Sequence, residues 1–261
     1  MPQASEKVSA PSRPALRLAR GNSIRLSLFG GFAARSSNCA GGPPPVSAPR
    51  HQAMLAYLAM RPRFSETRER LAALLWSESG EVQARQNLRQ CLVRIRREFA
   101  PLGIDPVIVS AREIRLDPAR ITVDAMEFHD LARSGQPQDL EAAMALYQGA
   151  FLDGLNLGQE SFDEWHQAEH ARFERAAAQV MQKCARHRDQ SGDGAGAVRA
   201  AESLVAVDSL NEDSQRLYLR MLARHQGREA ALGHARTLTR LIKQECPAGP
   251  HKWVSSKLFS E

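Results

Sequence analysis

The stretch from Glu81 to Phe99 has a helical pattern that constrains the fold more than any other part of the sequence. At about 100° per residue, the apolar residues share one narrow face: Ala84, Leu88, Cys91, Leu92, Ile95 and Phe99. The opposite face is mostly glutamine and arginine: Gln83, Gln86, Arg89, Gln90, Val93, Arg94 and Arg97. Pro101 and Gly103 end the pattern. We therefore predict an amphipathic helix with one face on a core and the other outward.

The outward face of this helix has the chemistry of a DNA-reading surface. Glutamine can bond bidentately to adenine and arginine to guanine, while flanking arginines pair with phosphates. The alternative is an ordinary solvated polar face, which most charged helix surfaces are. The segments around the helix favour the DNA interpretation.

These segments predict the element order of a winged helix-turn-helix. Residues 24–29 alternate apolar and polar side chains, which predicts a strand, and short strands are expected around 32–34 and at Val46. Helices are predicted at 51–60 and after an N-cap at Ser65. The stretches 107–109 and 113–116 predict a hairpin after the amphipathic helix. Arg112, at the hairpin tip, could reach an adjacent groove.

From Val123 onward the sequence predicts helices, at 124–133, 139–148, 161–190, 194–207, 212–225 and 228–244. An offset of 34 residues relates Ala197 to Ala231, Ala201 to Ala235 and Leu204 to Leu238, which is the tetratricopeptide period. We predict a mainly α fold with a small β component: an N-terminal winged helix-turn-helix, then an all-α tetratricopeptide-like domain. The predicted boundaries are a disordered tail at 1–22, domains at 23–120 and 123–245, and a C-terminal tail at 246–261.

The charge is unevenly distributed along the chain. Residues 1–110 carry 16 Lys and Arg against 7 Asp and Glu, whereas residues 111–261 carry 19 against 22. The basic N-terminal part predicts a polyanionic partner. Thirty of the 35 basic residues are Arg, which suits phosphate and guanine, although a GC-rich coding bias explains this ratio equally well.

Other features bear on location. No apolar run approaches the roughly 18 residues that span a bilayer, so no membrane association is expected. The N-terminus shows no apolar signal-peptide core. Cys39, Cys91, Cys184 and Cys246 have no paired spacing, which indicates a reducing compartment, and we expect the cytoplasm.

Residues 24–120 resemble the winged-helix domain of the SARP-type bacterial transcriptional activators (antibiotic regulatory proteins). The resemblance rests on 24–32, 55–59, 71–76 and above all 84–97, which reads ARQNLRQCLVRIRR. This last stretch is similar to the family's A-R-x-x-L-R-x-x-L-x-R-L-R-R, with Ile95 in place of leucine. Residues 123–245 resemble the bacterial transcriptional activator domain, through 123–128, 145–152, 162–165 and 227–232.

The resemblance implies sequence-specific binding to direct repeats in double-stranded DNA, usually with contact to RNA polymerase. The helical half would supply dimerisation (a homodimer is one possibility), effector sensing or the polymerase contact. Two features depart from the family. Arg50 fits the basic residue that commonly precedes the first helix, but His51 is less usual, and 247–261 lacks the usual continuation. No nucleotide-binding P-loop is found, which excludes the larger ATPase-bearing regulators.

These arguments assign two sets of DNA contacts. The residues expected at base edges are Gln83, Gln86, Arg89, Gln90 and Val93. The residues expected at phosphates are Arg50, Arg85, Arg94, Arg96 and Arg97, with Arg112 on the wing.

Two alternatives compete with this interpretation. His166-Gln-Ala-Glu169-His170 formally matches the H-x-x-E-H zinc-peptidase pattern, but catalytic zinc needs a third protein ligand, and a packing helix explains the stretch better. We expect no enzyme, cofactor or metal. The rival function is a protein-interaction module whose helical repeats bind a partner and whose winged helix does not read DNA.

Overall fold

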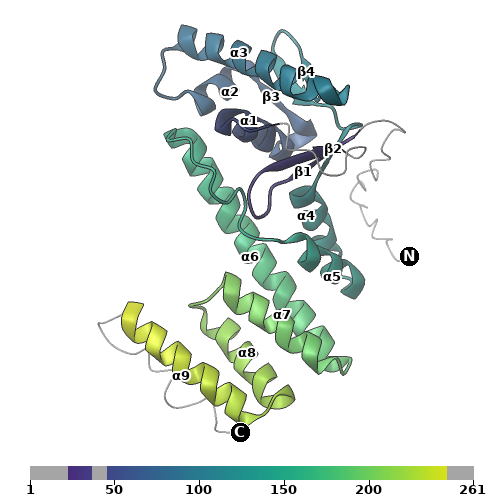
Figure 1. Ribbon diagram of the computed structural model, residues 1–261, viewed down its shortest axis with the longest axis vertical. Helices are drawn as coiled ribbons and strands as arrows, with labels where there is room; N and C mark the ends of the chain where they lie inside the picture. The colour runs from purple at the N-terminus through teal and green to yellow at the C-terminus, as the bar shows by residue number, and fades with distance from the viewer. Residues whose placement is uncertain (1–22, 37–45, 246–261) are drawn as a thin grey trace, which may run out of the picture.

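The computed structural model describes residues 23–36 and 46–245 and has two lobes. The upper lobe in Figure 1 holds short strands and the helices α1 to α3, and the lower lobe holds α7 to α9. The long helix α6 runs between them, with α4 and α5 at its side. The tails predicted at 1–22 and 246–261 lie outside the described residues.

The first sheet has the strand order β2-β1-β6. Strand β1 (Ile24–Ser27) pairs antiparallel with β2 (Ala33–Ser36) and parallel with β6 (Ile121–Val123). Ile24 and Leu26 are almost fully buried, as the alternating pattern predicts. Strand β6 was not predicted, because it pairs with β1, about a hundred residues earlier, and no neighbouring strand forms a hairpin with it. Val46 is buried but belongs to no strand, so that prediction is wrong.

The three predicted helices of the upper lobe are confirmed as α1 (Pro49–Met60), α2 (Arg68–Leu75) and α3 (Glu81–Phe99). The start of α2 differs from the prediction. Ser65 lies in a strand, β3 (Ser65–Thr67), and Thr67 caps α2 by accepting a hydrogen bond from the Arg70 N–H at 3.3 Å. Pairing of Ser65 with Arg115 extends the backbone here and moves the cap two residues along the chain.

The predicted hairpin is confirmed with the predicted limits, as β4 (Val107–Val109) and β5 (Glu113–Leu116). Strand β3 adds to it, which gives a second sheet of order β3-β5-β4. Short 3-10 turns, η1 (Pro62–Phe64) and η2 (Ala100–Leu102), follow α1 and α3. Ile114 and Leu116 are fully buried, so the hairpin is fixed to the body of the lobe.

The remaining helices are α4 (Asp124–Ser134), α5 (Pro137–Leu146), α6 (Glu160–Gln190), α7 (Gly194–Val207), α8 (Glu212–His225) and α9 (Arg228–Glu245). Their limits differ from the predicted ones by at most two residues. Residues of the 34-residue repeat lie on the packed faces of their helices. Ala197 and Leu204 on α7 are buried, and so are Ala231 and Leu238 on α9. The predicted fold class is confirmed.

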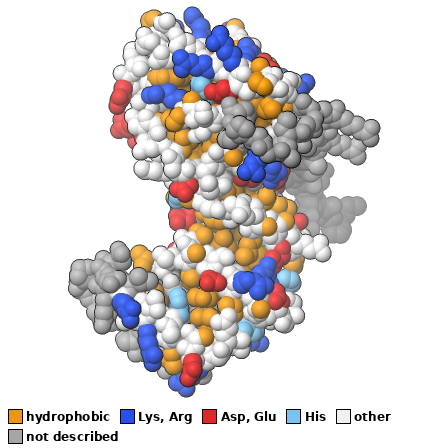
Figure 2. Space-filling model, viewed as in Figure 1, with side chains coloured by type: hydrophobic (Ala, Val, Ile, Leu, Met, Phe, Trp, Pro, Cys, Tyr) orange, Lys and Arg blue, Asp and Glu red, His pale blue; other side chains and the backbone are white. Residues whose placement is uncertain are grey.

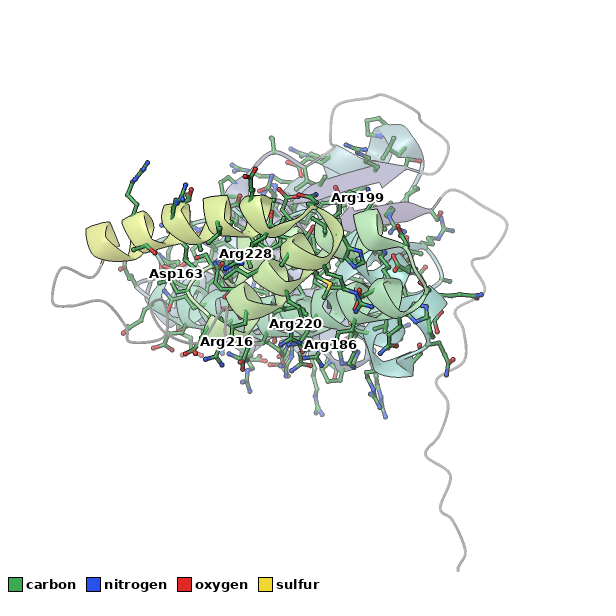
Figure 3. All side chains as sticks on the ribbon, turned by 90° about the horizontal axis from the view of Figure 1, so that it is seen from below. Asp163, Arg186, Arg199, Arg216, Arg220 and Arg228 are labelled. Atoms are coloured by element: carbon green, nitrogen blue, oxygen red, sulfur yellow. The ribbon has the colours of Figure 1, made fainter. Side chains whose placement is uncertain are left out.

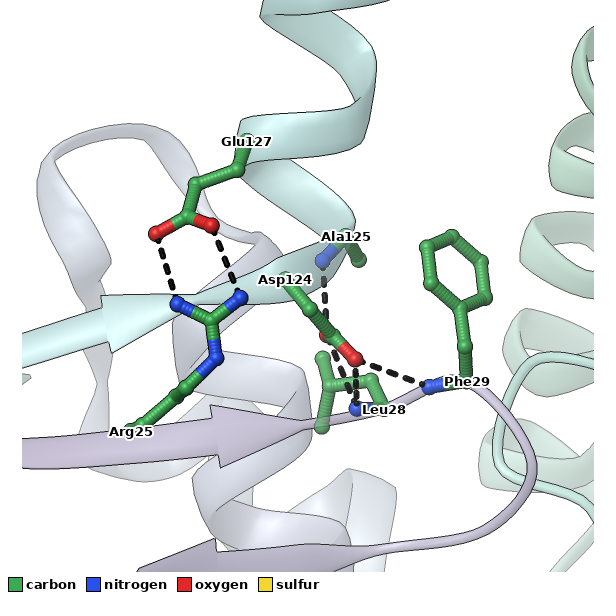
Figure 4. A network of polar contacts seen from close by, with 6 residues as sticks. All are labelled: Arg25, Leu28, Phe29, Asp124, Ala125 and Glu127. Carbon is green, nitrogen blue, oxygen red and sulfur yellow. Dashed lines mark hydrogen bonds and ion pairs between the residues drawn. The ribbon is translucent and has the colours of Figure 1, made fainter. Parts of the chain in front are cut away.

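A polar network ties β1 to α4 (Figure 4). The carboxylate of Asp124 is buried and accepts the N–H groups of Leu28 (2.8 Å), Phe29 (3.3 Å) and Ala125 (2.7 Å). Burial raises the pKa of Asp124, and the N–H donors oppose that rise. Beside it, Arg25 donates to both oxygens of Glu127, at 3.1 and 2.8 Å.

Aromatic side chains continue this junction into the core. The ring of Phe29 lies 5.3 Å from Phe128, 4.9 Å from Tyr147 and 5.2 Å from Phe173, between centroids. These distances are typical of favourable aromatic pairs. Tyr57 on α1 and Trp165 on α6 are 5.0 Å apart. The winged-helix elements and the helical half therefore share one continuous core.

The buried thiols provide a test of this packing. Burial raises the pKa of Cys91, on α3, to about 12 and that of Cys184, on α6, to about 11. Because a raised pKa leaves little thiolate at pH 8, we expect iodoacetamide to leave both thiols unmodified in the native protein and to modify both in urea. Peptide mass spectrometry measures each site separately. Rapid native labelling of Cys91 would mean that α3 is not packed as described.

Candidate nucleic-acid interface

Helix α3 lies along the outer edge of the upper lobe (Figure 1), where Lys and Arg side chains gather in Figure 2. Its six predicted core residues are all buried. All the predicted outward residues are exposed, including Gln86, Arg89 and Gln90. The sequence therefore predicted correctly which face of α3 the solvent reaches.

The arginines of α3 differ in what they contact. Arg85 forms an ion pair with Glu81, and the Arg96 Nε lies 3.0 Å from an Asp105 carboxylate oxygen. Within the described residues, the side chains of Arg89, Arg94 and Arg97 form no ion pair or hydrogen bond. The guanidinium groups of these three arginines are therefore available to an anionic ligand.

A shallow hollow of about 430 Å³ lies on the outward face of α3. It is lined by Arg89, Gln90, Val93, Arg94 and Arg97. Three of these five side chains are cationic and none is acidic. A surface of this kind attracts anions and offers both bidentate and apolar contacts.

A second cleft, of about 400 Å³, lies beside the hollow. Arg50 at the start of α1 and Arg94 on α3 both line it, together with Trp76. Asn156 and Leu157, from the segment between α5 and α6, line it as well. The helical half thus reaches the edge of the basic surface, which no sequence pattern indicated.

His51, which departs from the usual family residue, has a structural explanation. Its side chain is buried, and Nδ1 lies 2.9 Å from a Glu98 carboxylate oxygen. The pair links the first turn of α1 to the last turn of α3. Arg50, the residue before His51, lines the cleft.

Arg112 is exposed at the tip of the hairpin between β4 and β5. The Ser110 hydroxyl accepts the N–H groups of Arg112 (3.3 Å) and Glu113 (2.9 Å), which fixes the turn. The Arg68 N–H donates to the Arg112 carbonyl at 3.0 Å. The wing tip is thus held next to the start of α2, with its arginine side chain exposed.

The family model of the bacterial transcriptional activator domain matches residues 123–253, half of the chain. The chain belongs to this family. Together with the winged helix-turn-helix before the matched region, this makes it a SARP-type transcriptional regulator.

The fold of this regulator also occurs among solved structures. It is similar to Mycobacterium tuberculosis EmbR, solved in complex with a low affinity phosphopeptide, with a TM-score of 0.62 and 18% sequence identity. The match covers 89% of this chain and 63% of the EmbR chain, so the regulator spans less than two thirds of that structure. No curated protein matches the sequence at a significant level.

Two residues of the zinc-peptidase pattern have other partners in the regulator. The His166 Nε2 lies 2.9 Å from the Phe151 carbonyl, and Glu169 accepts a hydrogen bond from Arg172 at 2.8 Å. Within residues 23–36 and 46–245, no three His, Cys, Asp or Glu side chains gather in a way that could hold a metal ion. In the same part of the chain, no helix is long and apolar enough to cross a membrane.

Proposed function

We propose that this regulator binds double-stranded DNA sequence-specifically, with α3 in the major groove, and activates transcription in the cytoplasm. The observation that carries the proposal is the outward face of α3, with three unpaired arginines around one hollow. A major groove about 12 Å wide admits one helix. The 19 residues of α3 extend for about 28 Å, enough to follow the groove over several base pairs.

The contacts divide by position on α3. In this proposal, five residues face the base edges: Gln83, Gln86, Arg89, Gln90 and Val93. Arg50 and Arg94 line the same cleft, and in this proposal both contact phosphates of one DNA strand. Arg97 lies one turn after Val93 and also contacts a phosphate. Arg85 and Arg96 would have to exchange Glu81 and Asp105 for phosphates, so we expect them to contribute less. Arg112 would approach the adjacent groove from the wing.

The Arg89→Ala variant tests the orientation of α3. We expect it to cost about 1–3 kcal/mol of binding free energy and to relax selectivity at one base position. Arg94→Ala is the matched comparison and should weaken binding to all sequences alike, with a salt slope lower by about 1. Gel shifts on a selected operator, with every single-base variant, measure both effects. If Arg89→Ala keeps its operator affinity and selectivity, the proposed orientation is wrong.

We also propose that the helical half serves assembly on DNA, as a homodimer on direct repeats and through contact with RNA polymerase. The activator family and the reach of Asn156 and Leu157 to the DNA side of the lobe support this role. The rival, a pure protein-interaction module, predicts DNA affinity that is weak and nearly independent of salt. Sequence-selective binding that also weakens steeply between 50 and 200 mM salt, as contacts to the phosphate backbone require, would exclude the rival.

A further inference from the structure

Two valines on α3 are exposed although valine is apolar. Val82 is 81% exposed and Val93 is 48% exposed. Among the described residues, the other large apolar side chains with such exposure are Ile108 and Leu210. A single exposed valine needs no explanation, but here two lie on the face that carries Gln86 and Arg89.

The two valines share one side of α3. They are eleven residues apart, so at about 100° per residue their directions differ by only about 20°. The rise of about 1.5 Å per residue separates them by about 16 Å, which corresponds to about five base pairs. With α3 in the major groove, Val82 and Val93 therefore lie over two different base pairs.

The surroundings of Val93 restrict what it can contact. It is the apolar residue in a hollow otherwise lined by Arg89, Gln90, Arg94 and Arg97. Arg89 and Arg97 lie one turn before and one turn after it. A ligand in this hollow must bring a small apolar group to Val93 and anionic or hydrogen-bond-accepting groups to the rim.

In the major groove, the thymine 5-methyl group is the apolar feature of the base edges, and phosphates and guanine acceptors flank it. The geometry points to Val82 and Val93 as readers of thymine methyl groups, one near each end of the base-contacting stretch. This inference rests on the proposed function and specifies the base that two residues read. Val82 belongs to neither set of contacts predicted from the sequence.

Deoxyuridine provides the test, because it lacks only the methyl group and keeps the hydrogen-bonding edge of thymine. An operator is first selected from a random duplex library with the full chain. Each thymine is then replaced by deoxyuridine, and affinities are measured for the wild type, Val82→Ser and Val93→Ser. Leu210→Ser, at an apolar residue between α7 and α8 that is 66% exposed, is the matched control.

For each valine, we expect one thymine whose replacement by deoxyuridine weakens wild-type binding about fourfold. This is the factor in affinity that the burial of one methyl-sized group contributes. The same replacement should have no further effect in the matching Val→Ser variant and its full effect in Leu210→Ser. Tight, selective binding with every deoxyuridine tolerated would overturn the inference and leave the proposed function intact. A methyl effect that persists in both valine variants would assign the reading to other residues and also overturn it. If no operator is selected at all, both proposals fail.

Discussion

Replacing Asp124 by alanine is expected to lower the free energy of unfolding by about 3 kcal/mol. The substitution leaves the buried N–H groups of Leu28, Phe29 and Ala125 without their acceptor, and each such donor costs about 1–3 kcal/mol. The low end of that range applies, because the substitution also removes the free-energy cost of burying the carboxylate, the same burial that raises the pKa of Asp124. Urea denaturation followed by tryptophan fluorescence measures the change.

Two variants control this prediction. Asp130→Ala removes an exposed carboxylate from the same helix and should change the stability by less than about 0.5 kcal/mol. Asp124→Asn keeps one acceptor oxygen and should fall between Asp124→Ala and the wild type. A stability of Asp124→Ala equal to that of Asp130→Ala would show that the network in Figure 4 does not hold β1 to α4.

The triple variant Arg89→Ala, Arg94→Ala, Arg97→Ala is expected to bind DNA at least about 100-fold more weakly in moderate salt. Arg89 contributes about 1–3 kcal/mol as a base contact, and each lost phosphate contact adds to the deficit. The salt slope should also fall by about 2, since two phosphate contacts are removed. All three side chains are exposed, so circular dichroism and thermal melting should be unchanged.

The matched control removes the same charge from the helical half. Arg186, Arg199 and Arg220 (Figure 3) are exposed, and none of the ion pairs in the described part of the chain includes them. Their triple alanine variant should lose less than about threefold in DNA affinity, through long-range electrostatics alone. Equal weakening by both triple variants would mean that net charge, and not the face of α3, determines the binding.

The amphipathic pattern of α3 was sufficient to predict its limits and its exposed face. The spacing of the apolar residues indicates which side chains of the helix are buried, and Ala84, Leu88 and Ile95 are buried as predicted. The hairpin and the six later helices were predictable for the same reason. Ser65 misled the prediction because it resembles an N-cap, whereas pairing with β5 makes it part of a strand and leaves Thr67 as the cap.

The candidate site was only partly predictable. The helical spacing predicts that five arginines of α3 are exposed: Arg85, Arg89, Arg94, Arg96 and Arg97. It does not predict which of them are unpaired, because the partner of Arg96 is Asp105, on the segment that leads to the wing. The cleft that brings Arg50 and Arg94 together also depends on the segment before α6.

The sequence by itself determined the helices, the hairpin, the basic outward face of α3 and the resemblance to a family of transcriptional activators. These features are local, since each repeats at the period of a helix or a strand. Only the tertiary structure decided that β6 pairs with β1, that Asp124 accepts three backbone N–H groups, and that Arg50 and Arg94 line one cleft. Such contacts join segments up to about a hundred residues apart, and no local period encodes which of them meet.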